Sequence, residues 1–181
     1  MGEPKQLLKY RGHSLLSHTL QEAVNANEGT VIVVLGANAN VLAKEINNKE
    51  VSIVENKEWQ EGMAASVRTG IEALQKINPS VDGAILMVCD QPFLSAALLN
   101  ELVNKQRETG KPVVTCNYGE AIGPPALFHK TFFPELMKLK GDAGARKIIQ
   151  QHSDEVATVL FPEGSFDIDT RKDYEELIQK K

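Results

Sequence analysis

The residue in this sequence whose chemistry is most informative is Asp90, because it comes directly after an unbroken apolar run. Residues 84–88 are all apolar, and Cys89, Asp90, Gln91 and Pro92 follow them. Such a run predicts a strand buried on both faces, as in a parallel sheet covered by helices, and these sheets bind ligands beyond the carboxyl ends of their strands. We therefore expect Asp90 to lie at the edge of the sheet where ligands bind. The alternative is that Asp90 caps the helix after Pro92.

A second set of carboxylates lies near the C-terminus. Asp167 and Asp169 are two residues apart, so both would point to one face of an extended segment. Mg²⁺ prefers oxygen ligands, and one or two carboxylates with phosphate oxygens would complete its coordination sphere. Alternatively, one of these aspartates caps the last helix, although Thr170 followed by Asp173 resembles a capping box by itself.

The segment around Gly62 predicts a helix start that could bind a nucleotide. Ser66 and Arg68 lie near this start, where exposed N–H groups and the positive helix end favour anionic or ribose oxygens. Asn56 and Trp59 precede it, and Trp59 either covers a ligand or packs against the sheet. The alternatives are that Ser66 is an ordinary polar residue and Arg68 a solvated one.

Two further glycine-containing segments predict a turn and a helix start that could contribute to a binding site. Gly123, with the two prolines after it, indicates a rigid turn that would let a ligand approach the backbone closely, or simply a loop. Residues 141–146 predict a helix start in which Asp142 is the cap and Arg146 lies within one turn of it.

The composition excludes several classes of function. The 181 residues contain 24 acidic and 20 basic side chains, and the basic ones are scattered, so we expect no nucleic-acid partner. The apolar runs are of strand length, which predicts no membrane span, no signal peptide and a cytoplasmic protein. No P-loop sequence and no H-x-x-x-H pair occurs, which argues against a P-loop kinase and a zinc site. Cys89 and Cys116 are expected to be apolar fillers of buried strands.

The elements that position these residues alternate along the chain. Apolar periodicity predicts helices at residues 15–24, 41–46, 63–74, 98–103, 132–139, 143–152 and 170–181. Continuous apolar or β-branched runs predict strands at residues 30–35, 51–54, 84–88, 112–116, 126–128 and 156–161. This alternation predicts one α/β domain over residues 1–181, a three-layer α/β/α sandwich around a mostly parallel sheet.

Several motifs taken together resemble those of one enzyme family. They are residues 1–8 (Met-Gly-Glu-Pro-Lys-Gln-Leu-Leu), 59–70, 88–92 (Val-Cys-Asp-Gln-Pro), 123–128, 141–146 and 166–170 (Phe-Asp-Ile-Asp-Thr). In this order they resemble the MobA-like nucleotidyltransferases, and most closely the molybdenum cofactor cytidylyltransferases. The resemblance implies the Rossmann-like fold of the nucleotide-diphospho-sugar transferases.

One family feature has no counterpart in this sequence. Family members carry a strand and a glycine-rich turn before the segment that matches residues 1–8, so relative to them the chain is truncated within the glycine-rich signature. Such turns bind phosphates through backbone N–H groups. We expect the first strand of the sheet to be missing, with a gap, a rearranged edge or a partner strand in its place.

The resemblance also implies roles for individual residues. Lys5 would reach the triphosphate, and Asp169 would approach Asp90 to hold Mg²⁺ with it. It further implies that Ser66, Arg68, Gln91, Gly123 and Arg146 contribute to binding of the nucleotide or the acceptor.

The implied function is transfer of CMP from CTP to the terminal phosphate of molybdopterin or its molybdenum form, with release of pyrophosphate. A molybdoenzyme would be a further partner. The alternatives are transfer of another nucleotide, such as GMP, transfer to another acceptor, such as a sugar phosphate, and a non-catalytic protein that binds and delivers the cofactor.

Overall fold

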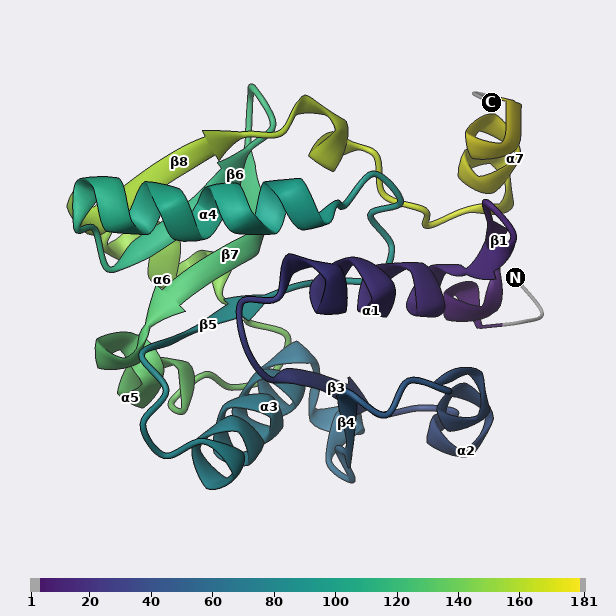
Figure 1. Ribbon diagram of the computed structural model, residues 1–181, viewed down its shortest axis with the longest axis horizontal. Coiled ribbons are helices and arrows are strands. Elements are labelled where there is room, and N and C mark those ends of the chain that lie inside the picture. Colours follow the sequence, from purple (N-terminus) through teal and green to yellow (C-terminus); the bar gives the residue numbers. More distant parts are fainter. Residues whose placement is uncertain (1–3, 180–181) are drawn as a thin grey trace.

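The computed structural model of the protein describes residues 4–179 (Figure 1). Residues 1–3 of the first motif, and residues 180–181 of the helix predicted at residues 170–181, lie outside the described residues. The helices are α1 (Leu15–Ala26), α2 (Ala39–Leu42), α3 (Met63–Ile77), α4 (Ala96–Thr109), α5 (Phe133–Leu136), α6 (Arg146–Gln151) and α7 (Arg171–Gln179). The strands are β1 (Lys9–Tyr10), β2 (His13–Ser14), β3 (Val31–Leu35), β4 (Val51–Glu55), β5 (Gly83–Leu86), β6 (Val113–Asn117), β7 (Ile122–His129) and β8 (Val156–Leu160). Short 3₁₀ helices are η1 (Lys5–Leu7), η2 (Ala43–Glu45), η3 (Trp59–Glu61), η4 (Lys130–Phe132), η5 (Ser153–Glu155) and η6 (Pro162–Ser165).

The largest sheet has four strands in the order β5–β7–β6–β8 (Figure 1). Strand β7 is antiparallel to both of its neighbours, and β6 is parallel to β8. The predicted mostly parallel sheet is therefore mixed, with β7 as the reversed strand. The connection from β6 to β7 is only residues 118–121, and so short a connection joins antiparallel strands.

Successive residues of these strands alternate between two cores, because side chains along a strand point to opposite faces. Val113 and Phe128 pack on one face with α3, α5 and α6. Val114 and Leu127 pack on the other face with α4 and the end of α1. This arrangement confirms the three-layer α/β/α sandwich, and it explains why these strands show an unbroken apolar sequence.

Strands β3 and β4 form a separate parallel pair, in register from Val31 opposite Val51 to Leu35 opposite Glu55. Apolar side chains of α1 and α2 cover this pair, among them Leu16, Leu20 and Leu42. Within residues 4–179, β3 pairs only with β4 and β5 only with β7, so no hydrogen-bonded ladder joins the two sheets. A break of this kind is what the sequence predicts for a sheet that lacks one strand.

The strand that leads to Asp90 is shorter than predicted. It ends at Leu86, and Cys89 and Asp90 lie in the turn that follows. Asp90 does not cap the next helix, since the Ser95 hydroxyl does so by accepting a hydrogen bond from the N–H of Leu98 at 3.3 Å. The carboxylate of Asp90 is therefore available for another role.

The predicted turn at Gly123 is also wrong, because Gly123, Pro124 and Pro125 lie inside β7. In the register of β6 against β7, Thr115 opposes Ala126 whereas the next residue, Cys116, opposes Gly123. Pro124 and Pro125 fall in this irregularity, where no ladder partner needs the N–H that proline lacks.

Both cysteines are free thiols, Cys116 buried and Cys89 half-buried. Burial raises the pKa of Cys89 to about 11 and that of Cys116 to about 12. Neither side chain is a thiolate near neutral pH, so neither is an activated nucleophile. Only Cys116 lies in a strand, whereas the prediction had placed both there.

Within residues 4–179, no helix combines the length and the apolar composition that crossing a lipid bilayer requires.

A histidine links three elements on the α5 and α6 side of the sheet. The two ring nitrogens of His152, which follows α6, each lie 3.0 Å from a carboxylate, Glu135 of α5 and Glu155 of η5. The ring also packs edge-on against Phe132, with a centroid distance of 5.0 Å. The hydrogen bond to Glu155, together with that to Glu135, raises the pKa of His152 above its ordinary value of 6.5.

This raised pKa predicts a pH-dependent contribution of His152 to stability. Below about pH 6.5, the histidine is protonated in both the folded and the unfolded state, and its two ion pairs stabilise the fold fully. The contribution disappears as the pH rises through the higher pKa of the folded state. We expect the difference in free energy of unfolding between the wild type and His152→Gln, measured by urea titration, to be largest at pH 5.5 and to shrink by pH 9. The exposed His13 of β2, changed to Gln, is the control, and a difference that grows with pH would contradict the assignment.

Candidate functional site

The side chains of Lys5, Asp90 and Asp169 converge from three distant parts of the sequence. The ammonium nitrogen of Lys5 lies 2.7 Å from Oδ2 of Asp90 and 2.9 Å from Oδ1 of Asp169. Lys5 begins η1, Asp90 follows β5, and Asp169 precedes α7. These three residues form what we call the acidic rim, and they are the group that the family resemblance implies to be catalytic.

Local structure explains how Asp169 reaches Asp90. The residue between the two C-terminal aspartates, Ile168, is fully buried in a cluster with Tyr10, Leu15 and Leu177. Its backbone N–H donates a hydrogen bond to the carbonyl oxygen of Asp90 at 3.1 Å. The segment is thereby anchored against the residue that carries the first carboxylate.

The alternative that Asp169 caps α7 does not hold. The carboxylate of Asp173 accepts hydrogen bonds from the backbone N–H groups of Thr170 at 2.7 Å and Asp169 at 3.1 Å. The Thr170 hydroxyl in turn accepts one from the N–H of Asp173 at 3.2 Å. This is the predicted capping box, and it leaves the Asp169 carboxylate free to pair with Lys5.

Charge at the acidic rim shifts two pKa values. Burial opposes the charged form of Lys5, but hydrogen bonds to Asp90 and Asp169 outweigh it and raise the pKa of Lys5. Burial and the negative charges of Asp90 and Asp169 raise the pKa of Asp167 above its ordinary value. Asp167 is therefore within electrostatic range of the rim, although the ammonium of Lys5 pairs with the other two carboxylates.

The rim fits a divalent cation that is shared between protein and phosphate. One cation, the ammonium of Lys5, already contacts both Asp90 and Asp169, so their oxygens are close enough to bind a common ion. Within residues 4–179, no group of three or more His, Cys, Asp or Glu residues could hold a metal by itself. Two carboxylates without a full protein cage suit Mg²⁺, which keeps water and phosphate ligands.

Gln91 is buried and is a structural connector. Its amide nitrogen donates hydrogen bonds to the carbonyl oxygen of Gly164 and to the hydroxyl of Tyr118, both at 3.0 Å. The Tyr118 hydroxyl donates to the carbonyl oxygen of Pro124 in β7. Gln91 thus ties the turn of Asp90 to the segment that leads to Asp169. With only 2% of its surface exposed, it cannot contact a ligand without rearrangement.

Gly123 and Arg146 both lie close to Tyr118. A side chain at Gly123 would place its Cβ 2.8 Å from the Tyr118 hydroxyl, which explains glycine there. Arg146 begins α6 with an exposed side chain, and its positive charge acts on the Tyr118 hydroxyl. Nothing in the sequence singled out Tyr118, because its role depends on contacts with residues far along the chain.

Ser66 lies in the first turns of α3, as predicted, and pairs with a buried residue. Its hydroxyl accepts a hydrogen bond from the side-chain amide of Asn56 at 3.0 Å. The side-chain carbonyl oxygen of Asn56 in turn accepts a hydrogen bond from the backbone N–H of Glu58 at 2.9 Å. This pair fixes the loop between β4 and α3.

The guanidinium of Arg68 is neither solvated nor directed at the acidic rim. It donates to both carboxylate oxygens of Glu61, at 3.0 and 2.5 Å, and to the carbonyl oxygen of Leu139 at 2.6 Å. The Glu61 carboxylate also accepts from the N–H of Gly141 at 3.3 Å. Arg68 and Glu61 therefore join the start of α3 to the segment before α6. No local pattern indicates this link, because Leu139 and Gly141 become neighbours of Arg68 and Glu61 only on folding.

Backbone contacts also join the start of α3 to the segment before α6. Gly62 has φ 116° and ψ −168°, and a Cβ there would collide with the Asp142 carboxylate and lie 2.6 Å from the carbonyl oxygen of Gly141. That carbonyl accepts a hydrogen bond from the N–H of Ala64 at 3.0 Å. Asp142 is not the cap of α6, which begins after Ala145 without a side-chain cap.

Two large apolar side chains remain exposed at the start of α3. Trp59 is 44% exposed and Met63 is 53% exposed. Trp59 rests against Gly36 at the end of β3, and a Cβ at Gly144 would lie 2.8 Å from the sulfur of Met63. Trp59 is thus half-buried, with one part of the indole packed and the rest available for contact.

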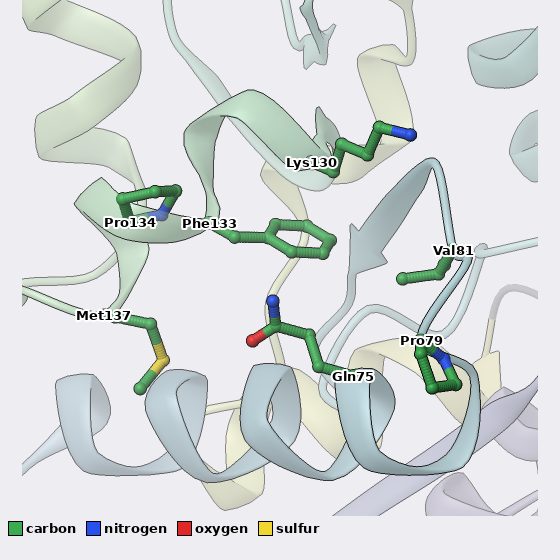
Figure 2. A pocket seen from close by; sticks show the side chains of 7 residues that line it. All are labelled: Gln75, Pro79, Val81, Lys130, Phe133, Pro134 and Met137. Atoms are coloured by element: carbon green, nitrogen blue, oxygen red, sulfur yellow. The ribbon is translucent and has the colours of Figure 1, made fainter.

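A separate hollow of about 350 Å³ lies at the other end of α3. Figure 2 shows the side chain of Gln75 of α3 pointing into it, toward Phe133 of α5. Gln75, Lys130 and apolar side chains line this hollow, and none of them belongs to the predicted site.

Comparison with known proteins shows which family this protein resembles. The protein is similar to the purine catabolism protein PucB of Bacillus subtilis, with 28% identity over 97% of this chain and 88% of that one. It is also similar to Rv0371c of Mycobacterium tuberculosis H37Rv, with 30% identity, a TM-score of 0.83, and 99% of this chain and 90% of that one covered. A second structure of Rv0371c, in complex with manganese, shows 32% identity and a TM-score of 0.79 over 98% of this chain and 93% of that one.

The family match extends over most of the sequence and confirms the resemblance seen in the motifs. Residues 1–156 match the family described as the MobA-like NTP transferase domain. This range includes Lys5, Asp90 and the Arg68 and Glu61 link, and it ends before Asp169. This match and the similarity to Rv0371c show that the chain belongs to the MobA-like NTP transferase family.

Proposed function

We propose that this protein transfers CMP from CTP to the terminal phosphate of molybdopterin or its molybdenum form, and that Asp90 and Asp169 hold the Mg²⁺ that the reaction uses. The observation that carries the proposal is the convergence of Lys5, Asp90 and Asp169 within hydrogen-bond distance. A cation and carboxylates at one rim suit a reaction whose reactants are all phosphates.

The chemistry needs no nucleophile from the protein. An oxygen of the acceptor phosphate attacks the α-phosphorus of the nucleotide, and the bond from this phosphorus to the bridging oxygen breaks, releasing pyrophosphate. Such a step depends on alignment of the reactants and neutralisation of their charge. When bound, Mg²⁺ would neutralise phosphate charge. The ammonium of Lys5 would bind the triphosphate as a point charge.

We assign the acceptor to the surface between Trp59, Met63 and Arg146. The exposed indole and thioether offer apolar contact to a flat ring system, and the exposed guanidinium of Arg146 offers a partner for phosphate. The link between Arg68 and Glu61 would hold this surface in place by joining α3 to the segment before α6.

The relatives support two parts of this proposal. Membership in the NTP transferase family supports nucleotidyl transfer. The manganese complex of Rv0371c supports the use of a divalent cation, and both Mg²⁺ and its position at the acidic rim are our assignments from the oxygen ligands. The preference for CTP and molybdopterin comes from the motifs.

A nucleotide panel tests the proposal. CTP, GTP, ATP and UTP are each incubated with the protein, MgCl₂ and molybdopterin, and pyrophosphate release is measured. We expect turnover with CTP at a kcat/KM at least about tenfold above that with the others, since a site that pairs with one base rejects the rest. A preference for GTP would mean that the protein transfers GMP and not CMP. Turnover with a sugar phosphate but not with molybdopterin would mean that the proposed acceptor is wrong. Nucleotide binding without turnover in any combination would favour a delivery protein.

A further inference from the structure

Lys5 lies where a divalent cation would have to bind. Its ammonium nitrogen contacts one oxygen of Asp90 at 2.7 Å and one of Asp169 at 2.9 Å. These are the carboxylates that we assign to the cation in the proposed function, on which this inference rests. A Mg²⁺ or Mn²⁺ ion binds carboxylate oxygens at about 2.1 Å. An ion bound to the same two oxygens would therefore lie against the ammonium, and the two positive charges would repel each other.

The ammonium also has a structural task at this position. Asp90 and Asp169 are brought together by the hydrogen bond from the N–H of Ile168 to the carbonyl oxygen of Asp90. Two carboxylates so close repel each other unless a cation lies between them. Lys5 supplies that charge.

Lys5 is able to leave this position. Its side chain is 29% exposed and that of Asp169 is 69% exposed, so the rim opens to solvent. A lysine side chain is long and flexible, and its charge can move to a phosphate without displacing the backbone. A bound triphosphate would offer the ammonium new partners, while the metal replaces it between the carboxylates.

We propose that Lys5 is a placeholder for the divalent cation: it holds Asp90 and Asp169 in position and competes with the metal, until the nucleotide phosphates draw the ammonium away. The metal alone then binds weakly, and the metal and the nucleotide each strengthen the binding of the other. This coupling is reciprocal, as thermodynamic linkage requires.

Titration with Mn²⁺, followed by the electron paramagnetic resonance signal of the free ion, tests the inference on the folded full-length chain. Without nucleotide, we expect Lys5→Met to bind Mn²⁺ about tenfold more tightly than the wild type, because a competing charge has been removed. Lys5→Gln, also uncharged, should behave in the same way. Lys5→Arg keeps a cation and should bind as weakly as the wild type. Lys9→Met, which removes an exposed lysine paired with Glu45, is the matched control and should change nothing.

Adding a non-hydrolysable methylene analogue of CTP completes the test. We expect the analogue to tighten Mn²⁺ binding in the wild type about tenfold, since coupling between two sites commonly has this size. It should tighten binding much less in Lys5→Met, where no ammonium has to move. Mn²⁺ binding to Lys5→Met or Lys5→Gln that is equal to or weaker than wild-type binding would overturn the placeholder role.

A second pair of variants separates this outcome from failure of the proposed function. Asp90→Asn should weaken Mn²⁺ binding in both the wild-type and the Lys5→Met background. If it does, and Lys5→Met is no tighter than the wild type, the metal site stands and only the placeholder role is wrong. If Asp90→Asn has no effect in either background, the metal is bound elsewhere and both proposals fail.

Discussion

The substitution Asp90→Asn is expected to lower the rate of nucleotidyl transfer by at least about 100-fold, because it removes a charge that would hold the catalytic cation. Asparagine is nearly isosteric with aspartate, and the backbone carbonyl of residue 90 would still accept its hydrogen bond from Ile168. The free energy of unfolding should therefore change little. The measurements are pyrophosphate release under saturating CTP and molybdopterin, and urea unfolding of the same sample.

The other aspartates supply the controls for this experiment. Asp169→Asn should cause a loss of similar size, whereas Asp167→Asn should cause a smaller one, because Lys5 pairs with Asp169 and not with Asp167. Asp82→Asn removes an exposed carboxylate that pairs with Lys130, far from the acidic rim in sequence, and it should leave the rate unchanged. Equal losses at Asp167 and Asp169 would show that the metal is held differently from our proposal.

The second large effect is expected for Gly62→Ala, which should lower the free energy of unfolding by about 3 kcal/mol. The backbone at Gly62 has φ 116°, a conformation that residues with a Cβ rarely adopt. The added methyl group would also collide with the carboxylate of Asp142 and the carbonyl of Gly141. Relief of this collision would separate the start of α3 from the segment before α6, so transfer should also fall. Urea unfolding monitored by circular dichroism gives the stability.

Gly110→Ala is the matched control for this prediction. Gly110 ends α4 with φ 65°, and a Cβ there would meet nothing within 4 Å. This variant should therefore lose only the backbone contribution, about 1 kcal/mol, and no activity. A loss of unfolding free energy in Gly62→Ala that does not exceed the loss in Gly110→Ala would contradict this prediction. It would mean that the contact between the start of α3 and the segment before α6 accommodates the methyl group and does not hold the acceptor surface.

Most of the secondary structure could be predicted from periodicity, and the departures have physical causes. The helix at residues 15–24 and the strand at residues 30–35 correspond to α1 and β3, because their apolar spacing reflects what they bury. The reversed direction of β7 within the mostly parallel sheet was not predicted, because it follows from the short connection after β6 and not from composition. The turn predicted at Gly123 was wrong because two prolines normally end a strand, and only the pairing register shows where β7 tolerates them.

The residues of the candidate site also differ in how much the sequence predicts about them. Asp90 was identified from an apolar run, and the Asp-x-Asp spacing identified Asp167 and Asp169 together. The choice of Asp169, and Lys5 altogether, came from the family motifs, since an isolated lysine carries no signal. The roles of Gln91 and Arg68 depend on partners more than 70 residues away, Gly164 and Leu139. No local pattern encodes such partners, so the sequence could name these two residues but not what they contact.

The break between the two sheets has a consequence for how the protein opens. Strands β3 and β4 pack against α1 and α2 in their own apolar cluster, and within residues 4–179 no backbone ladder connects them to the other four strands of the sandwich. Cooperativity between the two parts must then come from packing and from isolated hydrogen bonds, such as that between the N–H of Ala96 and the carboxylate of Glu22 in α1 at 2.8 Å. Such contacts protect amides less uniformly than a continuous ladder does. We therefore expect the amide hydrogens of β3 and β4 to exchange by local opening more readily than those of the half that carries Asp90.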